Sequence, residues 1–144
     1  MGDPAGIGPE VLVKAFAALP ATRHADIFVM GDIASLELAQ QQTGKFFPIH
    51  KTKRPDDPTI DHHTLYVFEP IVFDANEVVQ GQISAACGRA AVKWFERAIT
   101  IALDGGIEGI VTCPINKEAR HQVFFCDKSC SFNKGFVSRQ MCDF

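Results

Sequence analysis

The sequence predicts an α/β fold built on a mostly parallel sheet. Three short apolar runs are typical of buried strands, and segments with helical periodicity separate them; the runs cover 26–30, 65–68 and 107–112. The longest periodic segment, 84–103, keeps apolar residues on one helical face. Because strands that alternate with helices are joined by crossover connections, we expect the strands to run parallel.

The first helix is expected directly after a glycine-rich opening, GDPAGIGPE. Pro9 suits the first helical position, since its missing N–H would be unpaired there. Glu10 then places negative charge in the first turn, where the helix dipole favours it. We expect the helix to extend to about residue 19 and to bury a face with i, i+3, i+4, i+7 spacing: Leu12, Ala15, Phe16 and Leu19.

A strand at 26–30 and a second helix are expected next. Asp32 can cap that helix, and Gly44 can end it after about residue 42. Two more strands and a charged, proline-containing surface loop are expected beyond it: strands at 46–50 and 65–68, and the loop at 51–63.

The long helix at 84–103 has a capping residue, Ser84, and a glycine pair that ends it at 105–106. Its expected buried face consists of Ala91, Phe95, Ala98 and Ala102, with Trp94 and Ile99 beside them. A buried strand at 107–112 should follow, and Cys113 and Pro114 should turn the chain. Beyond about residue 119 neither helical nor strand periodicity is present, and the composition changes, with three of the five cysteines at 126, 130 and 142.

Composition narrows the class of protein. The net charge of −3 argues against a nucleic acid or an anionic membrane as the main partner. No apolar run approaches the ~20 residues that span a bilayer, and no secretory leader opens the chain. An odd number of cysteines without such a leader does not suggest a disulfide framework. We therefore expect a soluble cytoplasmic protein.

The glycine-rich opening is the first candidate binding motif. Gly2, Gly6 and Gly8 allow positive φ angles and close approach of the backbone to a ligand. The helix start that follows offers free N–H groups to a phosphate or carboxylate. The motif is neither a Walker A loop nor a dinucleotide fingerprint. A tight strand-to-helix turn that binds nothing stays open as the alternative.

The second motif runs from Thr112 through Cys113, Pro114 and Ile115 to Asn116 and Lys117, at the end of an expected buried strand. Ligands of open α/β sheets lie outside the carboxyl ends of the strands, and a lysine there can hold an anion. The alternative is an ordinary polar helix start on the surface. We interpret Cys113 as a small buried residue and not as a nucleophile, since no histidine that could activate it lies near it in the sequence.

Two possible metal-binding clusters are weaker. His62 and His63 adjoin Asp61, but neighbouring residues converge on one ion only if the loop folds around it, so a solvated loop is the preferred interpretation. Cys126 and Cys130 have the spacing of half a zinc site, and the other half is missing.

Together the motifs resemble one family, the 4-hydroxythreonine-4-phosphate dehydrogenases (PdxA) of vitamin B6 biosynthesis. The matching segments are MGDPAGIGPE, the GQIS of 81–84 followed by Gly88, and the IVTCPINKEA of 110–119. The resemblance covers residues 1–119, which we interpret as a partial dehydrogenase domain with a partial α/β/α layered fold that lacks the family's second domain. Residues 120–144 form an unmatched tail, which a frameshift would explain.

The resemblance implies an enzyme that uses NAD and a divalent metal (Zn, Mg, Co or Mn). Such enzymes oxidise, with decarboxylation, a phosphorylated hydroxy acid such as 4-phosphohydroxy-L-threonine, in pyridoxal phosphate biosynthesis. Family members are two-domain homodimers. A dehydrogenase of four-carbon sugar-acid phosphates, such as threonate or erythronate 4-phosphate, is the alternative, and a non-catalytic remnant is another.

The same resemblance assigns binding residues but no catalytic residue and no metal ligand to this chain. The substrate-binding candidates are Asp3, Gly6, Gly8, Thr112, Asn116 and Lys117. The family continues with a Gly-His-Thr-Glu block and, farther on, with three metal-binding histidines. Here the tail reads RHQVFFCDKSC instead. We therefore expect this chain alone to be an inactive fragment.

Overall fold

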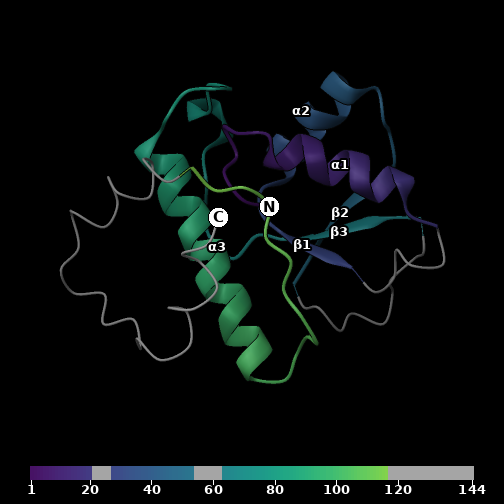
Figure 1. Ribbon diagram of the computed structural model, residues 1–144, viewed down its shortest axis with the longest axis vertical. Coiled ribbons are helices and arrows are strands. Elements are labelled where there is room, and N and C mark those ends of the chain that lie inside the picture. Colours follow the sequence, from purple (N-terminus) through teal and green to yellow (C-terminus); the bar gives the residue numbers. More distant parts are fainter. Residues whose placement is uncertain (21–26, 54–62, 117–144) are drawn as a thin grey trace.

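The computed structural model describes residues 1–20, 27–53 and 63–116, which form a small three-stranded parallel sheet with helices on both faces (Figure 1). The strand order is β1-β3-β2, and both strand pairs are parallel. This confirms the predicted α/β class. In chain order the elements are α1 (Gly8–Ala18), β1 (Phe28–Met30), α2 (Ile33–Thr43), β2 (Ile49–Thr52), β3 (Leu65–Phe68), a 3₁₀ turn (Ala75–Glu77) and α3 (Ala85–Leu103).

The central strand, β3, is the most deeply buried of the three. Val67 lies opposite Val29 of β1 and Lys51 of β2, and both Leu65 and Val67 are fully buried. A strand buried on both faces reads as a continuous apolar run instead of an alternating one, which is why the sequence LYVF at 65–68 predicted β3 with its observed bounds.

Two apolar clusters cover the two faces of the sheet. One joins α1 and α2 to the sheet around Val13, Phe16 and Leu36, and it includes Val29. The other joins α3 to the sheet through Trp94, and it includes Met30. Adjacent strand residues point to opposite faces, so α1 and α2 form one layer and α3 the other, as Figure 1 also shows.

The helix signals read from the sequence are confirmed. The Asp32 carboxylate accepts a hydrogen bond from Ser35 N–H at 2.8 Å and so caps α2. Gly44 ends that helix in the left-handed region with φ of 65°. The Ser84 hydroxyl accepts from Cys87 N–H and caps α3. These signals are local, because each depends on residues within one helical turn.

The buried face of α1 differs from the predicted one. Val13 and Phe16 are buried, whereas Leu12 and Leu19 are half-buried and Ala15 is exposed. The face is rotated because α1 packs against α2 as well as against the sheet. In α3 the buried residues centre on Trp94 and Ala98, while the predicted Phe95, Ile99 and Ala102 are half-buried.

The strand predicted at 46–50 is shifted to 49–52 in β2. Phe46 is 72% exposed, and Pro48 has no N–H with which to enter the ladder. The Pro48 carbonyl accepts from Leu65 N–H at 2.9 Å, so pairing starts only there. The predicted surface loop at 51–63 therefore loses its first two residues to β2, and most of its remainder, 54–62, lies outside the described residues.

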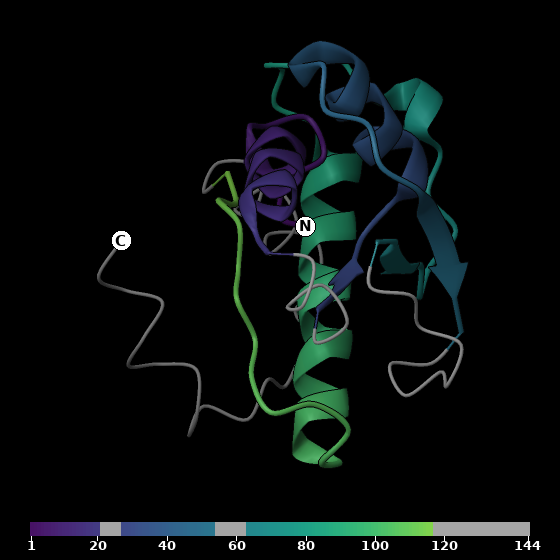
Figure 2. The same ribbon diagram turned by 90° about the vertical axis from the view of Figure 1, so that its right-hand side faces the viewer.

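The predicted strand at 107–112 is wrong. Figure 2 shows this segment as a chain without helix or strand. Val111 is 96% exposed. No described strand pairs with this segment, and a strand is stable only when a neighbour completes its hydrogen bonds. Cys113, expected to be buried, is half-buried. The tail from residue 117 lies outside the described residues. Among the helices that are described, none is long and apolar enough to cross a membrane.

Candidate functional site: the glycine loop and the 112–116 segment

The glycine loop, residues 2–8, begins beside the carboxyl end of β1. The Met1 ammonium donates to Met30 C=O at 2.8 Å, which sets the start of the loop against the last residue of that strand. Gly2 has a φ of 83°, and a Cβ there would lie 2.6 Å from Pro114 O. A Cβ at Gly8 would lie 2.5 Å from Met1 O. Both glycines are therefore required by close backbone packing within the protein.

Gly6 is different, because a Cβ at this position would meet no atom closer than 3.5 Å and would make ordinary contacts with Asp3. Gly6 is half-buried and keeps a negative φ. Among the three predicted loop glycines, it is the one that internal packing does not require.

Asp3 shapes the loop from the inside. Its side chain is 4% exposed, and its Oδ1 accepts from Ala5 N–H at 2.9 Å. The Asp3 carbonyl accepts from Gly6 N–H at 3.1 Å, which closes a tight turn. Burial raises the pKa of the Asp3 carboxyl, against the smaller opposing effect of the Ala5 hydrogen bond. The side chain thus holds the loop's own backbone.

The second motif meets the glycine loop in space, although about 110 residues separate them in the sequence. Asp3 N–H donates to Pro114 C=O at 3.2 Å. Cys113 lies against the loop, since a Cβ built at Gly2 would be 3.0 Å from the Cys113 Cβ. Thr112 is exposed and Asn116 is half-buried. Lys117, the cation predicted to bind an anion, lies outside the described residues.

A third segment, residues 79–84, fastens the loop from the other side. Gly81 N–H donates to Ala5 C=O at 2.8 Å, and the Gln80 side-chain amide donates to Pro4 C=O at 3.1 Å. Gln80 was not among the predicted site residues. Its position directly before the GQIS segment was the available signal, but only the tertiary structure brings it against the loop.

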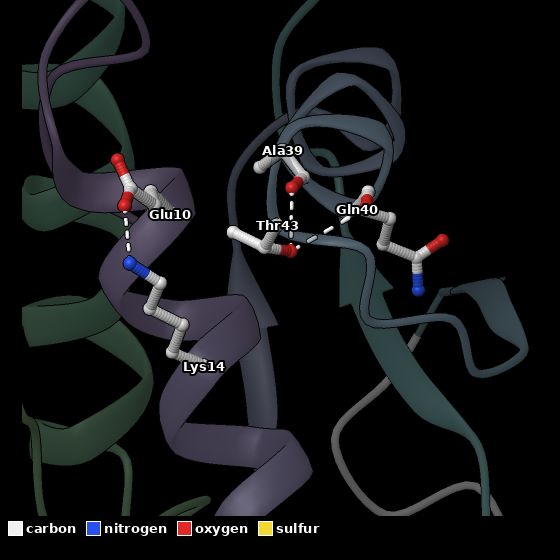
Figure 3. A network of polar contacts seen from close by, with 5 residues as sticks. All are labelled: Glu10, Lys14, Ala39, Gln40 and Thr43. Carbon is white, nitrogen blue, oxygen red and sulfur yellow. Dashed lines mark hydrogen bonds and ion pairs between the residues drawn. The ribbon is translucent and has the colours of Figure 1, made fainter.

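A hollow of about 140 Å³ lies between the glycine loop, α2 and the 79–84 segment. Gly6 lines it, together with the polar side chains of Glu10, Gln42 and Gln80. Figure 3 shows Lys14 reaching back along α1 to pair with the Glu10 carboxylate, which offsets that negative charge. The residue before α1, Ile7, provides no side-chain cap. Pro9 has no N–H and Val11 N–H donates to Ile7 C=O, so the capacity for a ligand at this helix start lies in the Gly8 and Glu10 N–H groups.

A second hollow, of about 270 Å³, lies at the carboxyl edge of the sheet, and two of its charged side chains, Lys51 and Glu69, already pair with one another. Glu69 bridges two elements there, since its carboxylate accepts from Ile33 N–H at 2.9 Å and pairs with Lys51. This arrangement fastens the start of α2 to the ends of β2 and β3.

The described residues contain no group of three or more His, Cys, Asp or Glu side chains that could hold a metal ion. His63 is exposed, while its predicted neighbours Asp61 and His62 lie outside the described residues, as do Cys126 and Cys130. The residues within the described ranges therefore do not fit the divalent metal that the resemblance implies.

Fold and site together define an α/β protein in which a glycine loop, anchored beside the end of a parallel strand, meets a Pro-Ile-Asn segment. The family follows from comparison with known sequences. Residues 23–129 match the family described as pyridoxal phosphate biosynthetic protein PdxA, and the chain belongs to this family. The resemblance seen in the motifs is confirmed, and the matched region extends past residue 119, where the motifs end.

Relatives named for two different dehydrogenase activities resemble this chain to a similar degree. A D-threonate 4-phosphate dehydrogenase of Cupriavidus necator is 33% identical over 121 residues, which are 84% of this chain and 36% of that protein. A 4-hydroxythreonine-4-phosphate dehydrogenase of Desulfosudis oleivorans is 35% identical over 119 residues, which are 83% of this chain and 35% of that protein. The chain thus spans about a third of the length of the curated relatives it matches.

Solved structures agree. The crystal structure of a 4-hydroxythreonine-4-phosphate dehydrogenase from Burkholderia phymatum superposes with a TM-score of 0.76 at 34% identity, covering 84% of this chain and 36% of that one. A second, from Klebsiella pneumoniae, gives 0.76 at 31% identity, covering 85% of this chain and 38% of that one.

Proposed function

We propose that this chain is one portion of an NAD-dependent dehydrogenase for a small phosphorylated hydroxy acid such as 4-phosphohydroxy-L-threonine. The observation that carries the proposal is the contact between the glycine loop and the 112–116 segment, made through Asp3 N–H and Pro114 C=O. Two segments that resemble the family's motifs are thereby held in contact beside the end of β1.

In this proposal the portion binds and positions substrate and does no chemistry of its own. The free N–H groups at the start of α1 attract the anionic end of the substrate, and Asn116 and Lys117 supply a donor and a cation. Gln80 and Asp3 hold the loop in shape and so limit the reorganisation that binding would require. NAD would supply the hydride acceptor. Since the described residues do not fit a metal, we expect no turnover by this chain alone.

Dehydrogenation of D-threonate or erythronate 4-phosphate is the second candidate, because relatives with the D-threonate 4-phosphate dehydrogenase name match this chain as closely as the others. The two substrate classes share the phosphate and the carboxylate, and they differ at the carbon beside the carboxylate, which carries an amino group in one and a hydroxyl in the other. The phosphate should therefore contact the loop in either case.

Both points can be tested on the purified chain. Titration of ¹⁵N-labelled protein with 4-phosphohydroxy-L-threonine, and separately with D-threonate 4-phosphate, should shift the amide signals of residues 6–8 and 115–117. Lys117→Ala should weaken binding of both, whereas the surface variant Lys45→Ala should not. Shifts confined to other residues, or none, would exclude substrate binding here and favour a non-catalytic remnant. Metal-dependent NAD reduction by the chain would refute its inactivity.

A further inference from the structure

The connections that follow two neighbouring strands, β1 and β3, leave the sheet on opposite faces. The two strands are adjacent and parallel. The helix after β1, α2, packs on the face that holds Val29, whereas the helix after β3, α3, packs on the face that holds Met30. Where connections diverge in this way a crevice opens outside the carboxyl ends of the strands, and ligands of open α/β sheets bind in such crevices. The topology therefore places a candidate ligand position between the ends of β1 and β3.

The second hollow, of about 270 Å³, lies at this position. Gly31 and Asp32, which follow β1, line it on one side, and residues 69–73, which follow β3, line it on the other. Its volume is close to the ~300 Å³ at which the range of small-molecule sites begins. All of its described lining residues lie outside the glycine loop. The second hollow is therefore a separate site from the one that we assign to the phosphorylated substrate.

Asp32 supplies this hollow with a hydrogen-bond acceptor that the protein does not use. The residue is only 7% exposed. The two hydrogen bonds that its side chain accepts, from the N–H and the hydroxyl of Ser35, both go to Oδ2 at 2.8 Å. Within the described ranges Oδ1 accepts none. Because a carboxylate oxygen that is shielded from water gains from any donor that reaches it, a ligand with hydroxyl or N–H groups would bind here.

The other charged side chains of the hollow disfavour an anion as the ligand. The Lys51 ammonium pairs with Glu69 Oε2, and Glu69 Oε1 accepts from Ile33 N–H at 2.9 Å. The charges of Lys51 and Glu69 therefore offset each other, and the charge of Asp32 remains. A phosphate or carboxylate next to that charge would be repelled, whereas a neutral group that donates hydrogen bonds would be held.

Ile71 and Phe73 give the hollow an apolar side. Both are half-buried and pack against the apolar cluster under α3. The Phe73 ring meets the Trp94 ring edge to face, with centroids 5.6 Å apart, and is therefore in place before a ligand binds. A flat ring that carries hydroxyl groups at one end combines the two kinds of contact, and a ribonucleoside has this form. In nucleotide-binding α/β sheets an acidic residue after a strand accepts hydrogen bonds from the ribose.

We propose that the second hollow binds a ribonucleoside, whose ribose hydroxyls donate to Asp32 Oδ1 and whose base lies against Ile71 and Phe73. The nucleoside is either free or the adenosine group of a dinucleotide such as NAD, and both sources offer the same hydroxyls and the same ring. Only the dinucleotide source rests on the proposed function. The site itself does not, because the phosphorylated substrate is assigned to the glycine loop.

Adenosine is the probe, and it is tested on the full chain. Titration of ¹⁵N-labelled protein with adenosine should shift the amide signals of Gly31, Asp32 and residues 71–73 and leave those of residues 6–8 and 115–117 unchanged. Titration with 4-phosphohydroxy-L-threonine should leave the signals of the hollow unchanged, so the two sites can fail separately. Shifts of the same amides by NAD would identify the dinucleotide as the source, and their absence with NAD would identify the free nucleoside.

Two changes of a single group make the test specific. 2′,3′-Dideoxyadenosine keeps the base and loses both hydroxyls, so it should bind at least ~10-fold more weakly than adenosine. Asp32→Asn keeps the cap of α2, because asparagine caps helices as well as aspartate does, but its amide places donors where Oδ1 accepts. This variant should bind adenosine ~10-fold more weakly and dideoxyadenosine as the parent chain does, a coupling that a purely structural role of Asp32 would not produce. The surface variant Lys45→Ala should bind both as the parent does. Equal binding of the two nucleosides by the parent chain, equal losses for both in Asp32→Asn, or shifts confined to other amides would overturn the proposal.

Discussion

Replacing Gly2 by alanine tests whether the glycine loop and the 112–116 segment are energetically coupled. Gly2 has a φ of 83°, and left-handed backbone costs an alanine ~1–2 kcal/mol. The new Cβ would also lie 2.6 Å from Pro114 O and 3.0 Å from the Cys113 Cβ. Relief of such overlap by a shift of packed atoms costs a further ~1–3 kcal/mol. The expected loss of unfolding free energy is therefore ~2–5 kcal/mol.

Gly44→Ala is the matched control, since Gly44 has a φ of 65° and nothing lies within 4 Å of its added Cβ. This variant should lose only the ~1–2 kcal/mol of unfolding free energy that left-handed backbone costs an alanine. Urea unfolding can be followed by the emission of Trp94, the single tryptophan, which is 2% exposed and packs edge-on against Phe73. If the two variants lose the same stability, the contact between the loop and Pro114 contributes nothing and the reasoning fails.

Three further predictions concern the cap, the core and pH. Asp32→Ala removes the acceptor of Ser35 N–H and should lower the unfolding free energy by ~1–2 kcal/mol. The control Asp74→Ala, at an exposed 3₁₀ turn, should change it by under ~0.5 kcal/mol. Equal melting temperatures of the two variants would contradict the capping role of Asp32. Leu36→Ala should lower the unfolding free energy by ~2–5 kcal/mol because Leu36 is fully buried. Val111→Ala should lower it by under ~0.5 kcal/mol because Val111 is 96% exposed. If chemical denaturation showed the larger loss for Val111→Ala, the described core would be wrong. Burial raises the pKa of the Asp3 carboxyl, so folding favours its protonated form. The stability that the protonated carboxyl contributes is complete below the unfolded pKa of ~4 and is lost as pH rises through the raised folded-state pKa. The parent chain should therefore lose stability between these two pKa values, and Asp3→Asn should flatten that decline in a series of urea unfolding curves at different pH.

Several elements could be predicted from the sequence because their signals are local. Asp32, Ser84 and Gly44 act within one turn of their helices, and they begin or end those helices as expected. The apolar run at 65–68 predicted the central strand, because a strand that is buried on both faces has apolar residues at successive positions. The family was likewise recognisable from its motifs, and the comparisons confirm it.

Other features depend on neighbours that are distant in the sequence. The run at 107–112 has the composition of a buried strand, yet no described strand pairs with it and it remains exposed. The face of α1 is rotated by its contact with α2. A local pattern cannot report either outcome, because both are set by which surfaces meet.

The sequence by itself determined the α/β class, the helix ends and the family, since these follow from periodicity, capping residues and ordered motifs. The tertiary structure alone decided why the loop needs its glycines. Gly2 and Gly8 are required by Pro114 and Met1, because their backbones approach too closely for a Cβ. It also decided that Asp3 turns inward and that Gln80 fastens the loop. Those roles arise from hydrogen bonds and packing that exist only once the chain has folded.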